Sequence, residues 1–260
     1  MPFVNVKGKQ IYYYSEAGFD SSKFSLVFLH GAGGSHRNWL SQVRHFSLGF
    51  NTIALDLPGH GESEGEGAGS ITEYREFVKT FLEALGLDRI VLVGHSMGGA
   101  ITQCFALAYP EALKGIVLVG TGARLRVSPK ILQTLQEDPQ AALDFICQWA
   151  YSPYARPELS KEGKEEMLKG SIWVMERDFR ACETFDIMTE VGRISLPTLV
   201  ICGTDDQLTP VKYSQYLHNH IQGSTLKIIS GAGHFVMLEK PEVFNLALEA
   251  FLKEILQASF

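Results

Sequence analysis

Short apolar runs separated by segments of helical periodicity constrain the fold of this 260-residue chain. The runs occupy residues 26–29, 52–55, 90–93, 116–119, 198–202 and 226–229. Continuous Val, Ile and Leu runs of this length are typical of strands that are buried on both faces of a parallel sheet. Segments 71–85, 97–108 and 241–256 instead repeat apolar residues at helical spacing. Strands alternating with helices predict an α/β fold with a mostly parallel central sheet, preceded by a hairpin over residues 3–14.

One region interrupts this alternation. Between about residues 124 and 190 the pattern is helical and rich in aromatic and sulfur-containing side chains. We therefore predict a helical cap over 124–190, inserted into a core formed by 1–123 and 191–260. The alternative is a small helical domain that only adds stability. The candidate substrate-binding residues of this cap are Trp149, Tyr151, Trp173, Met175 and Phe179.

Composition excludes several classes of protein. The chain is 45% hydrophobic and 20% charged, as ordinary globular proteins are, and its net charge of −6 argues against nucleic-acid binding. No apolar run approaches the roughly 18 residues of a membrane span, and no signal-peptide pattern begins the chain. Four cysteines without paired or metal-binding spacing predict reduced thiols. We expect a cytoplasmic monomer or homodimer without a nucleic-acid or membrane partner.

The segment GHSMGG at residues 94–99 follows one predicted strand and precedes one predicted helix. A serine on such a turn adopts an unfavourable backbone conformation, so its neighbours must be nearly free of side chains. The same turn exposes the hydroxyl above the sheet, at the positive end of the following helix. Ser96 is therefore either a turn residue or a catalytic nucleophile.

A serine nucleophile requires a base, and the base requires a carboxylate that orients it. His234 follows the run 226–229, at the edge of the sheet where parallel α/β proteins assemble their sites. Asp205 and Asp206 follow the run 198–202, and spacing alone does not choose between them. The chain order Ser, Asp, His matches the topology of an α/β sheet with a nucleophile elbow.

The segment HGAGG at residues 30–34 follows the run 26–29 and brings a backbone with few side chains to the same edge. The amides of Ala32 and Met97 are the expected donors to a developing oxyanion. A phosphate-binding loop is disfavoured, since neither Gly-Lys-Ser/Thr nor GxGxxG is present.

Together these motifs resemble the α/β-hydrolase superfamily over nearly the whole chain. The matching residues are His30-Gly31, Asp56-Leu57-Pro58-Gly59-His60-Gly61-x-Ser63, Gly94-His95-Ser96-Met97-Gly98-Gly99, Gly203-x-x-Asp206-x-x-x-Pro210 and Gly233-His234. The resemblance implies that Asp206 is the acid, that segment 124–190 covers the active site, and that no metal or organic cofactor is needed. It also implies that residues 56–63 form a supporting loop near the site.

A serine at the elbow disfavours the haloalkane dehalogenases and epoxide hydrolases of this superfamily, which carry an aspartate there. We therefore predict a serine carboxylesterase that acts on small or medium esters through the triad Ser96, Asp206 and His234. The alternatives are a C–C bond or lactone hydrolase of aromatic or quinone metabolism with the same triad, and a non-catalytic binding protein of the same fold. Membership of the superfamily does not identify the substrate.

Overall fold

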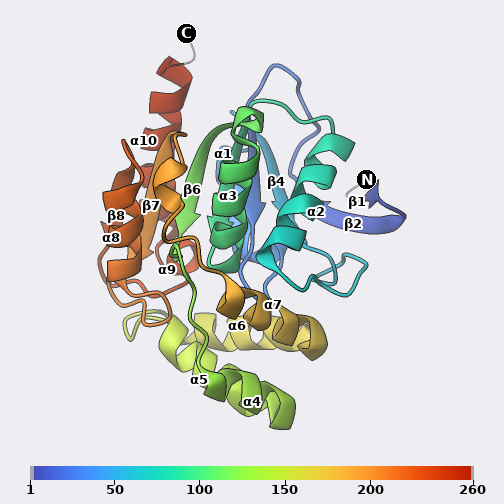
Figure 1. The fold of residues 1–260 in the computed structure, drawn as a ribbon, viewed down its shortest axis with the longest axis vertical. Helices are drawn as coiled ribbons and strands as arrows, with labels where there is room; N and C mark the ends of the chain where they lie inside the picture. The colour runs from blue at the N-terminus through green and yellow to red at the C-terminus, as the bar shows by residue number, and fades with distance from the viewer. Residues whose placement is uncertain (1–2, 259–260) are drawn as a thin grey trace.

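Eight strands form one sheet in the order β1-β2-β4-β3-β5-β6-β7-β8 in the computed structural model, which describes residues 3–258 (Figure 1). The strands are β1 (Phe3–Val6), β2 (Lys9–Tyr14), β3 (Ser25–Leu29), β4 (Asn51–Leu55), β5 (Ile90–His95), β6 (Leu113–Val119), β7 (Thr198–Gly203) and β8 (Thr225–Ile229). The β1–β2 and β2–β4 pairs are antiparallel, and all other pairs are parallel. This confirms the predicted hairpin and the mostly parallel sheet.

Helices cover both faces of the sheet because successive strand residues point to opposite sides. Val27 and Leu29 belong to one apolar cluster, whereas Leu26 and Phe28 belong to the other. The core helices are α1 (Leu40–Phe46), α2 (Ile71–Ala84), α3 (Met97–Ala108), α8 (Val211–His220), α9 (Val236–Glu239) and α10 (Pro241–Ala258), with short 3-10 helices η1 (His36–Trp39), η2 (Pro110–Ala112) and η3 (Val191–Arg193). Helices α2, α3 and α8 contribute to the first cluster, and α1, α9 and α10 contribute to the second.

Four α-helices between β6 and β7 form the cap over the end of the sheet. They are α4 (Pro129–Glu137), α5 (Pro139–Ala150), α6 (Pro157–Lys169) and α7 (Ile172–Thr184). Figure 1 shows them gathered beneath the core, on the side where the strands end. Their inner side chains form an apolar cluster of their own, which includes Ile131, Leu143, Ile146 and Met167. The exact division at residues 124 and 190 stays a prediction.

None of the helices within residues 3–258 combines the length and the apolar character that crossing a bilayer requires.

Candidate active site

Ser96 joins β5 to α3 and has φ 52° and ψ −114°, a conformation that side-chain-bearing residues rarely adopt. The surrounding hydrogen bonds hold it there. Its amide donates to the Val119 carbonyl at 2.9 Å, and its carbonyl accepts from Ala100 N–H at 3.1 Å and from the Thr121 hydroxyl at 2.9 Å. The structure therefore contains the strained elbow that the sequence pattern predicts.

The glycines around Ser96 are required because neighbouring atoms lie where a side chain would begin. A Cβ at Gly94 would lie 2.1 Å from the Gly98 carbonyl oxygen, and one at Gly98 would lie 2.5 Å from the Leu29 carbonyl oxygen. A Cβ at Gly99 would lie 2.6 Å from the Thr121 methyl carbon. Because these neighbours are backbone atoms and a buried side chain, the elbow tolerates no larger residue at these positions.

His234 and Asp206 meet beside the elbow. The Nδ1 atom of His234 lies 2.9 Å from Asp206 Oδ2, and both side chains are buried. Because the carboxylate accepts, Nδ1 carries the proton and Nε2 is the basic nitrogen. Asp206 is itself held by the amides of Leu208 and Thr209, which donate to Oδ1, and by the Thr209 hydroxyl, which donates to Oδ2.

Asp205 contacts a different part of the molecule. Its amide donates to the Ala232 carbonyl in the loop after β8, and its Oδ2 accepts from the Ser152 hydroxyl of the cap. It makes no hydrogen bond to His234 among the contacts of residues 3–258. Of the two aspartates that the spacing left open, the structure brings Asp206 to the histidine.

The loop of residues 30–34 forms a turn in which the amide of Gly34 donates to the carbonyl of Gly31 at 3.0 Å. The amide of Gly33 donates to the Asp178 carboxylate of the cap at 2.9 Å. By contrast, within the described part of the chain the amides of Ala32 and Met97 donate to no protein group. Ala32 and Ser96 line the same cavity, so both unused donors lie in or next to its wall.

This cavity lies between the sheet and the cap and has an empty volume of about 970 Å³, including the space at its mouth. Ser96 and His234 line it together with largely apolar side chains. The principal apolar contributors are Leu125, Val127, Ile131, Ile146, Tyr151, Met167, Phe179, Leu208 and Phe235. Arg126 and Glu166 are the charged members of the lining. The lining therefore favours a neutral, apolar group beside the serine.

The structure supports only part of the predicted substrate-binding set. Tyr151 and Phe179 line the cavity, but Trp149 and Trp173 do not, and they are 37% and 59% exposed. Both tryptophans lie on outward helix faces, where Trp149 packs against Phe145 and Trp173 against the Arg177 guanidinium. The prediction counted aromatic residues without assigning helix faces, and a role of these two residues in substrate binding stays a prediction.

Met175 is buried, but it lines a second cavity, which shares Gly33 and Gly34 with the first. Its side chain packs directly against Gly33, where an added Cβ would lie 2.8 Å from the Met175 methyl carbon. The predicted substrate-binding set also lacks the aliphatic lining residues of α4 and α5, such as Ile131 and Ile146. Their helical spacing marks the inward faces of these helices and would have identified them.

Two buried histidines near the site are neutral. His30 donates from Nδ1 to the Gly31 carbonyl and accepts the Leu57 amide at Nε2, and burial followed by the nearby His60 lowers its pKa to about 4. His95 contacts the His234 carbonyl through Nε2, and burial holds its pKa well below the ordinary value. These residues act as fixed supports of the loops rather than as proton carriers near neutral pH.

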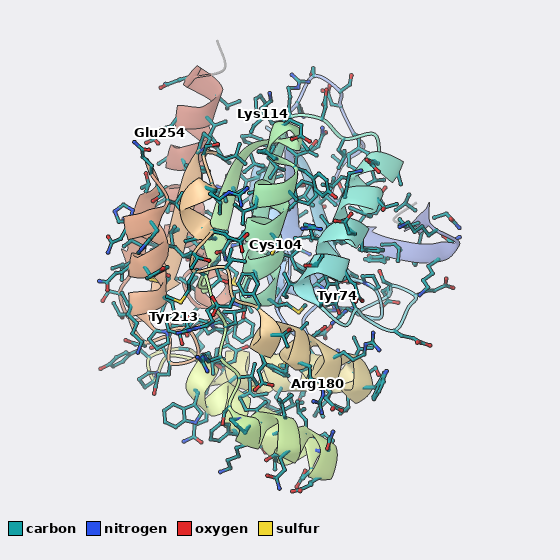
Figure 2. All side chains as sticks on the ribbon, viewed as in Figure 1. Tyr74, Cys104, Lys114, Arg180, Tyr213 and Glu254 are labelled. Carbon is teal, nitrogen blue, oxygen red and sulfur yellow. The ribbon has the colours of Figure 1, made fainter. Side chains whose placement is uncertain are left out.

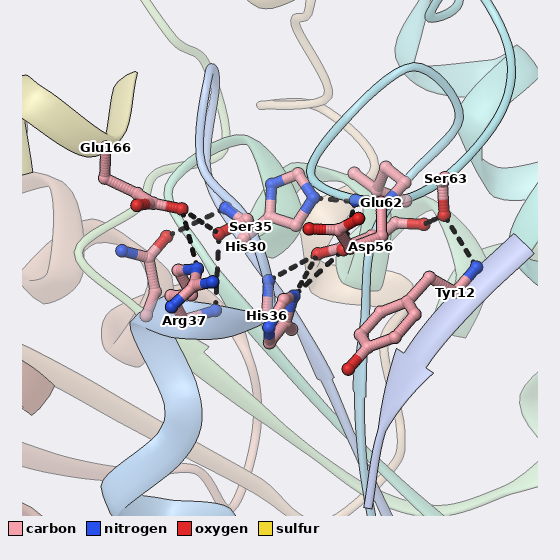
Figure 3. Close-up of polar contacts among 11 residues, drawn as sticks. Tyr12, His30, Ser35, His36, Arg37, Asp56, Glu62, Ser63 and Glu166 are labelled. Carbon is pink, nitrogen blue, oxygen red and sulfur yellow. Dashed lines mark hydrogen bonds and ion pairs between the residues drawn. The ribbon is translucent and has the colours of Figure 1, made fainter. Parts of the chain in front are cut away.

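The loop after β4 forms a second support (Figure 3). Asp56 is fully buried and accepts from the backbone amide of His36 at 2.5 Å, from His36 Nδ1 at 2.9 Å and from the Glu62 amide at 3.0 Å. The Ser63 hydroxyl donates to the Asp56 carbonyl and accepts the amide of Tyr12. These contacts join the loop to β2 and to the segment that follows residues 30–34.

Two ion pairs connect the cap to the core, one partly exposed and one buried. At the rim, Glu166 of α6 contacts Arg37 at 3.0 Å and Ser35 (Figure 3). In the interior, His60 Nε2 lies 2.7 Å from Asp178 of α7, and its Nδ1 faces the Pro58 carbonyl. Both ring nitrogens of His60 thus face acceptors, which requires the doubly protonated ring. Burial acts to lower the pKa of His60, but Asp178 and the hydrogen bonds raise it overall.

This ion pair predicts a pH-dependent contribution to stability. Because the pKa of His60 is higher in the folded state than its unfolded value of about 6.5, the stabilisation is complete below that pH and is lost as the pH rises through the folded pKa. His60→Gln should therefore reduce the free energy of unfolding most in acid solution and progressively less in alkali. Urea unfolding of both proteins across a pH series measures this, and a cost independent of pH would contradict it.

Within residues 3–258, no group of three or more His, Cys, Asp and Glu side chains is arranged to hold a metal ion.

Comparison with known proteins places this geometry in a family. The sequence model of the alpha/beta hydrolase fold matches residues 25–144 and 130–241. The structure of a thermophilic esterase is 36% identical, covers 97% of either chain and has a TM-score of 0.86. The 3-oxoadipate enol-lactonase 2 of Acinetobacter baylyi is 28% identical over 237 residues, 88% of both chains. The 2-hydroxy-6-oxo-6-phenylhexa-2,4-dienoate hydrolase of Comamonas testosteroni is 28% identical over 265 residues, 93% of this chain and 91% of that protein.

The chain therefore belongs to the alpha/beta hydrolase family, as its motifs predict, and its structural relatives include esterases. Its relatives also include lactone and dienoate hydrolases at low identity, so the family defines the fold and the general chemistry of hydrolysis but leaves the substrate open.

Proposed function

We propose that this protein is a serine carboxylesterase that cleaves small or medium esters whose acyl group carries no charge. The observation that carries the proposal is the pairing of His234 with buried Asp206 in a cavity whose wall also holds the strained Ser96. A serine hydroxyl is a weak nucleophile unless an adjacent base removes its proton, and we assign this role to His234, which lines the same cavity as Ser96.

In the proposed reaction, Nε2 of His234 takes the proton of Ser96 as Oγ attacks the ester carbonyl carbon. Asp206 keeps His234 in the tautomer that accepts at Nε2 and stabilises the imidazolium that forms. The oxyanion is bound by the amides of Ala32 and Met97. The imidazolium then gives its proton to the departing alcohol, and a water molecule activated by His234 hydrolyses the acyl-enzyme and releases the acid.

The lining of the cavity supports a neutral acyl or alcohol group. Its walls are mostly aliphatic and aromatic, and the charge of the Glu166 carboxylate in the lining is balanced by basic side chains. Glu166 is already paired with Arg37 and Lys169. Arg126 is exposed at the cavity and is the feature that would favour an acidic substrate instead.

A lactone or C–C bond hydrolase with the same triad is the second candidate. It is favoured by the similarity to the enol-lactonase and to the dienoate hydrolase. Both chemistries require an acyl carbonyl beside a serine or an activated water, so the triad alone does not separate them from ester hydrolysis.

The experiment that tests the proposal combines a fluorophosphonate probe with p-nitrophenyl esters of increasing acyl length. We expect labelling at Ser96 and turnover that rises and then falls with acyl length as the cavity fills. Efficient labelling without ester turnover would favour the second candidate, to be assayed with lactones and dienoates. Absence of labelling in folded protein would contradict a serine hydrolase altogether.

The side of the cavity formed by α5 is expected to set the acyl-chain length that the enzyme prefers. Ile146 is buried and lines the cavity from α5, whereas Trp149 projects outward from the same helix. Ile146→Phe should shift the optimum of the ester series to shorter acyl chains, because the larger ring occupies part of the apolar space. Trp149→Phe is the matched control and should leave the optimum unchanged. An unaltered optimum in Ile146→Phe would place the acyl group elsewhere.

A further inference from the structure

A buried carboxylate of the cap reaches the loop that carries the proposed oxyanion donor. Asp178 of α7 is fully buried and contacts three elements of the core. Its Oδ2 accepts the Gly33 amide at 2.9 Å and lies 2.7 Å from His60 Nε2, and its Oδ1 accepts the Tyr74 hydroxyl at 2.5 Å. Figure 2 shows Tyr74 at the part of α2 that lies nearest the cap. One cap side chain thus joins the loops after β3 and β4 to α2.

The contact with Gly33 restricts the amide next to it in the chain. The Gly33 N–H belongs to the peptide plane between Ala32 and Gly33, so holding it fixes the rotation of that plane about Ala32. The hydrogen bond from Gly34 to Gly31 closes the turn from the other side. Between these two restraints the direction of the Ala32 N–H is determined, although Ala32 itself forms no hydrogen bond with Asp178 within residues 3–258.

Glycines allow the cap helix to lie this close to the loops. Met175 packs against Gly33, whose φ of +64° also favours glycine, and Val174 packs against Gly59 and Gly67. In each case an added Cβ would lie 3.0 Å or less from the α7 side chain. Helix α7 therefore meets the core through backbone that bears no side chains, on the same face that carries Asp178.

The surroundings of Asp178 suit an ionised carboxylate. His60 is charged because both of its ring nitrogens face acceptors, so the buried pair is neutral overall. Removing one partner of such a pair leaves an uncompensated buried charge, and the groups that it held are then free to move.

We propose that Asp178 is a positioning residue for the oxyanion hole: by binding the Gly33 amide it orients the Ala32 N–H, so that docking of the cap and assembly of the hole are one event. This inference rests on the proposed serine-hydrolase mechanism, in which the Ala32 amide binds the oxyanion. Asp178 lies outside the cavity lining and acts through the loop.

The test is Asp178→Asn, with Glu176→Gln as the matched control. Glu176 lies on the same helix and is also buried, but it binds Arg180 and Gln136 within the cap. Each variant is assayed with an oxoester and with its thionoester, in which sulfur replaces the carbonyl oxygen and accepts hydrogen bonds poorly. A misdirected oxyanion donor should slow the oxoester about 10- to 100-fold and the thionoester much less.

We expect the ratio of oxoester to thionoester kcat/KM to fall at least about fivefold in Asp178→Asn and to stay at the wild-type value in Glu176→Gln. If Asp178→Asn does not fold, Tyr74→Phe tests the proposal instead. This variant removes one hydrogen bond from the Asp178 carboxylate and keeps its ion pair with His60. The same decrease should appear in that variant at smaller size. An unchanged ratio in whichever of the two variants folds overturns the proposal, since a purely structural role would lower stability without changing this ratio.

Amide hydrogen exchange separates this inference from the proposed function. The exchange rate of the Gly33 amide reports on its hydrogen bond to Asp178 and does not depend on catalytic activity. We expect this rate to rise at least about tenfold in Asp178→Asn relative to Glu176→Gln. Equal exchange rates overturn the inference even if the enzyme is a working esterase. Conversely, absence of fluorophosphonate labelling at Ser96 in the wild type refutes the proposed function and with it the role of Asp178 in an oxyanion hole.

Discussion

Ser96→Ala is expected to lower kcat for p-nitrophenyl esters by about six decades, because removal of the nucleophile disables a triad that works as a unit. At about 1.4 kcal/mol per decade, this corresponds to roughly 8 kcal/mol of lost transition-state stabilisation. The residual rate should reflect the unused amides of Ala32 and Met97 and the binding of the ester in the cavity. Steady-state kinetics on purified protein, with active-site titration of the wild type to exclude contaminating esterase, measure the change.

Ser70→Ala is the control for this substitution. The Ser70 hydroxyl caps α2 by accepting the Glu73 amide, and Ser70 does not line the cavity. Its replacement should cost about 1 kcal/mol of stability and leave kcat within a factor of two of the wild type. A decrease of less than tenfold in Ser96→Ala would show that Ser96 is not the nucleophile, whatever the stability of the variant.

The sheet and the elbow were predictable from the sequence because their determinants are local. The apolar runs identified the six parallel strands, and the glycines at 94, 98 and 99 form a recognisable motif around Ser96, although Gly98 and Gly99 are required by contacts with Leu29 and Thr121. The periodicity of 2 along a strand and of 3.6 along a helix carries this information in a window of a few residues.

The cap was harder to interpret because its function depends on which helix face points inward. Trp173 and Met175 are two residues apart, yet one is 59% exposed and the other 1% exposed. The role of Asp178 was not visible at all, since its partner Gly33 lies 145 residues away in the chain. No local pattern distinguishes a buried, paired aspartate from a solvated one on a polar helix, so only the tertiary structure reveals this contact.

The choice between Asp205 and Asp206 shows the same dependence on tertiary structure. Both lie in the loop after β7, where the Asp205 amide donates to the Ala232 carbonyl and the Asp205 side chain binds Ser152 of the cap. The Asp206 side chain then turns back to bind the amides of Leu208 and Thr209 and leaves Oδ2 for His234. The family resemblance selected the same residue from the spacing between Gly203 and Pro210.

Asp206→Asn is the second variant with a large expected effect, and the structure specifies why. Oδ1 receives two backbone amides, so an asparagine must place its carbonyl oxygen there and its NH₂ group at the Oδ2 position. That NH₂ group would donate toward Nδ1 of His234 and force the proton onto Nε2, the nitrogen that must accept from Ser96. A triad with the wrong tautomer loses about four decades of kcat.

Asp205→Asn is the matched control, one residue away. Its side chain binds the hydroxyls of Ser152 and Thr204, and an asparagine oxygen can accept the hydrogen bond from either. We expect kcat within about threefold of the wild type in this variant, because no group that contacts His234 has changed. The larger loss in Asp205→Asn would assign the acid to Asp205 and refute the tautomer argument. Equal and small losses would instead show that His234 works without a carboxylate partner, and the binding of its Nδ1–H by Asp206 would then serve only to hold the loop.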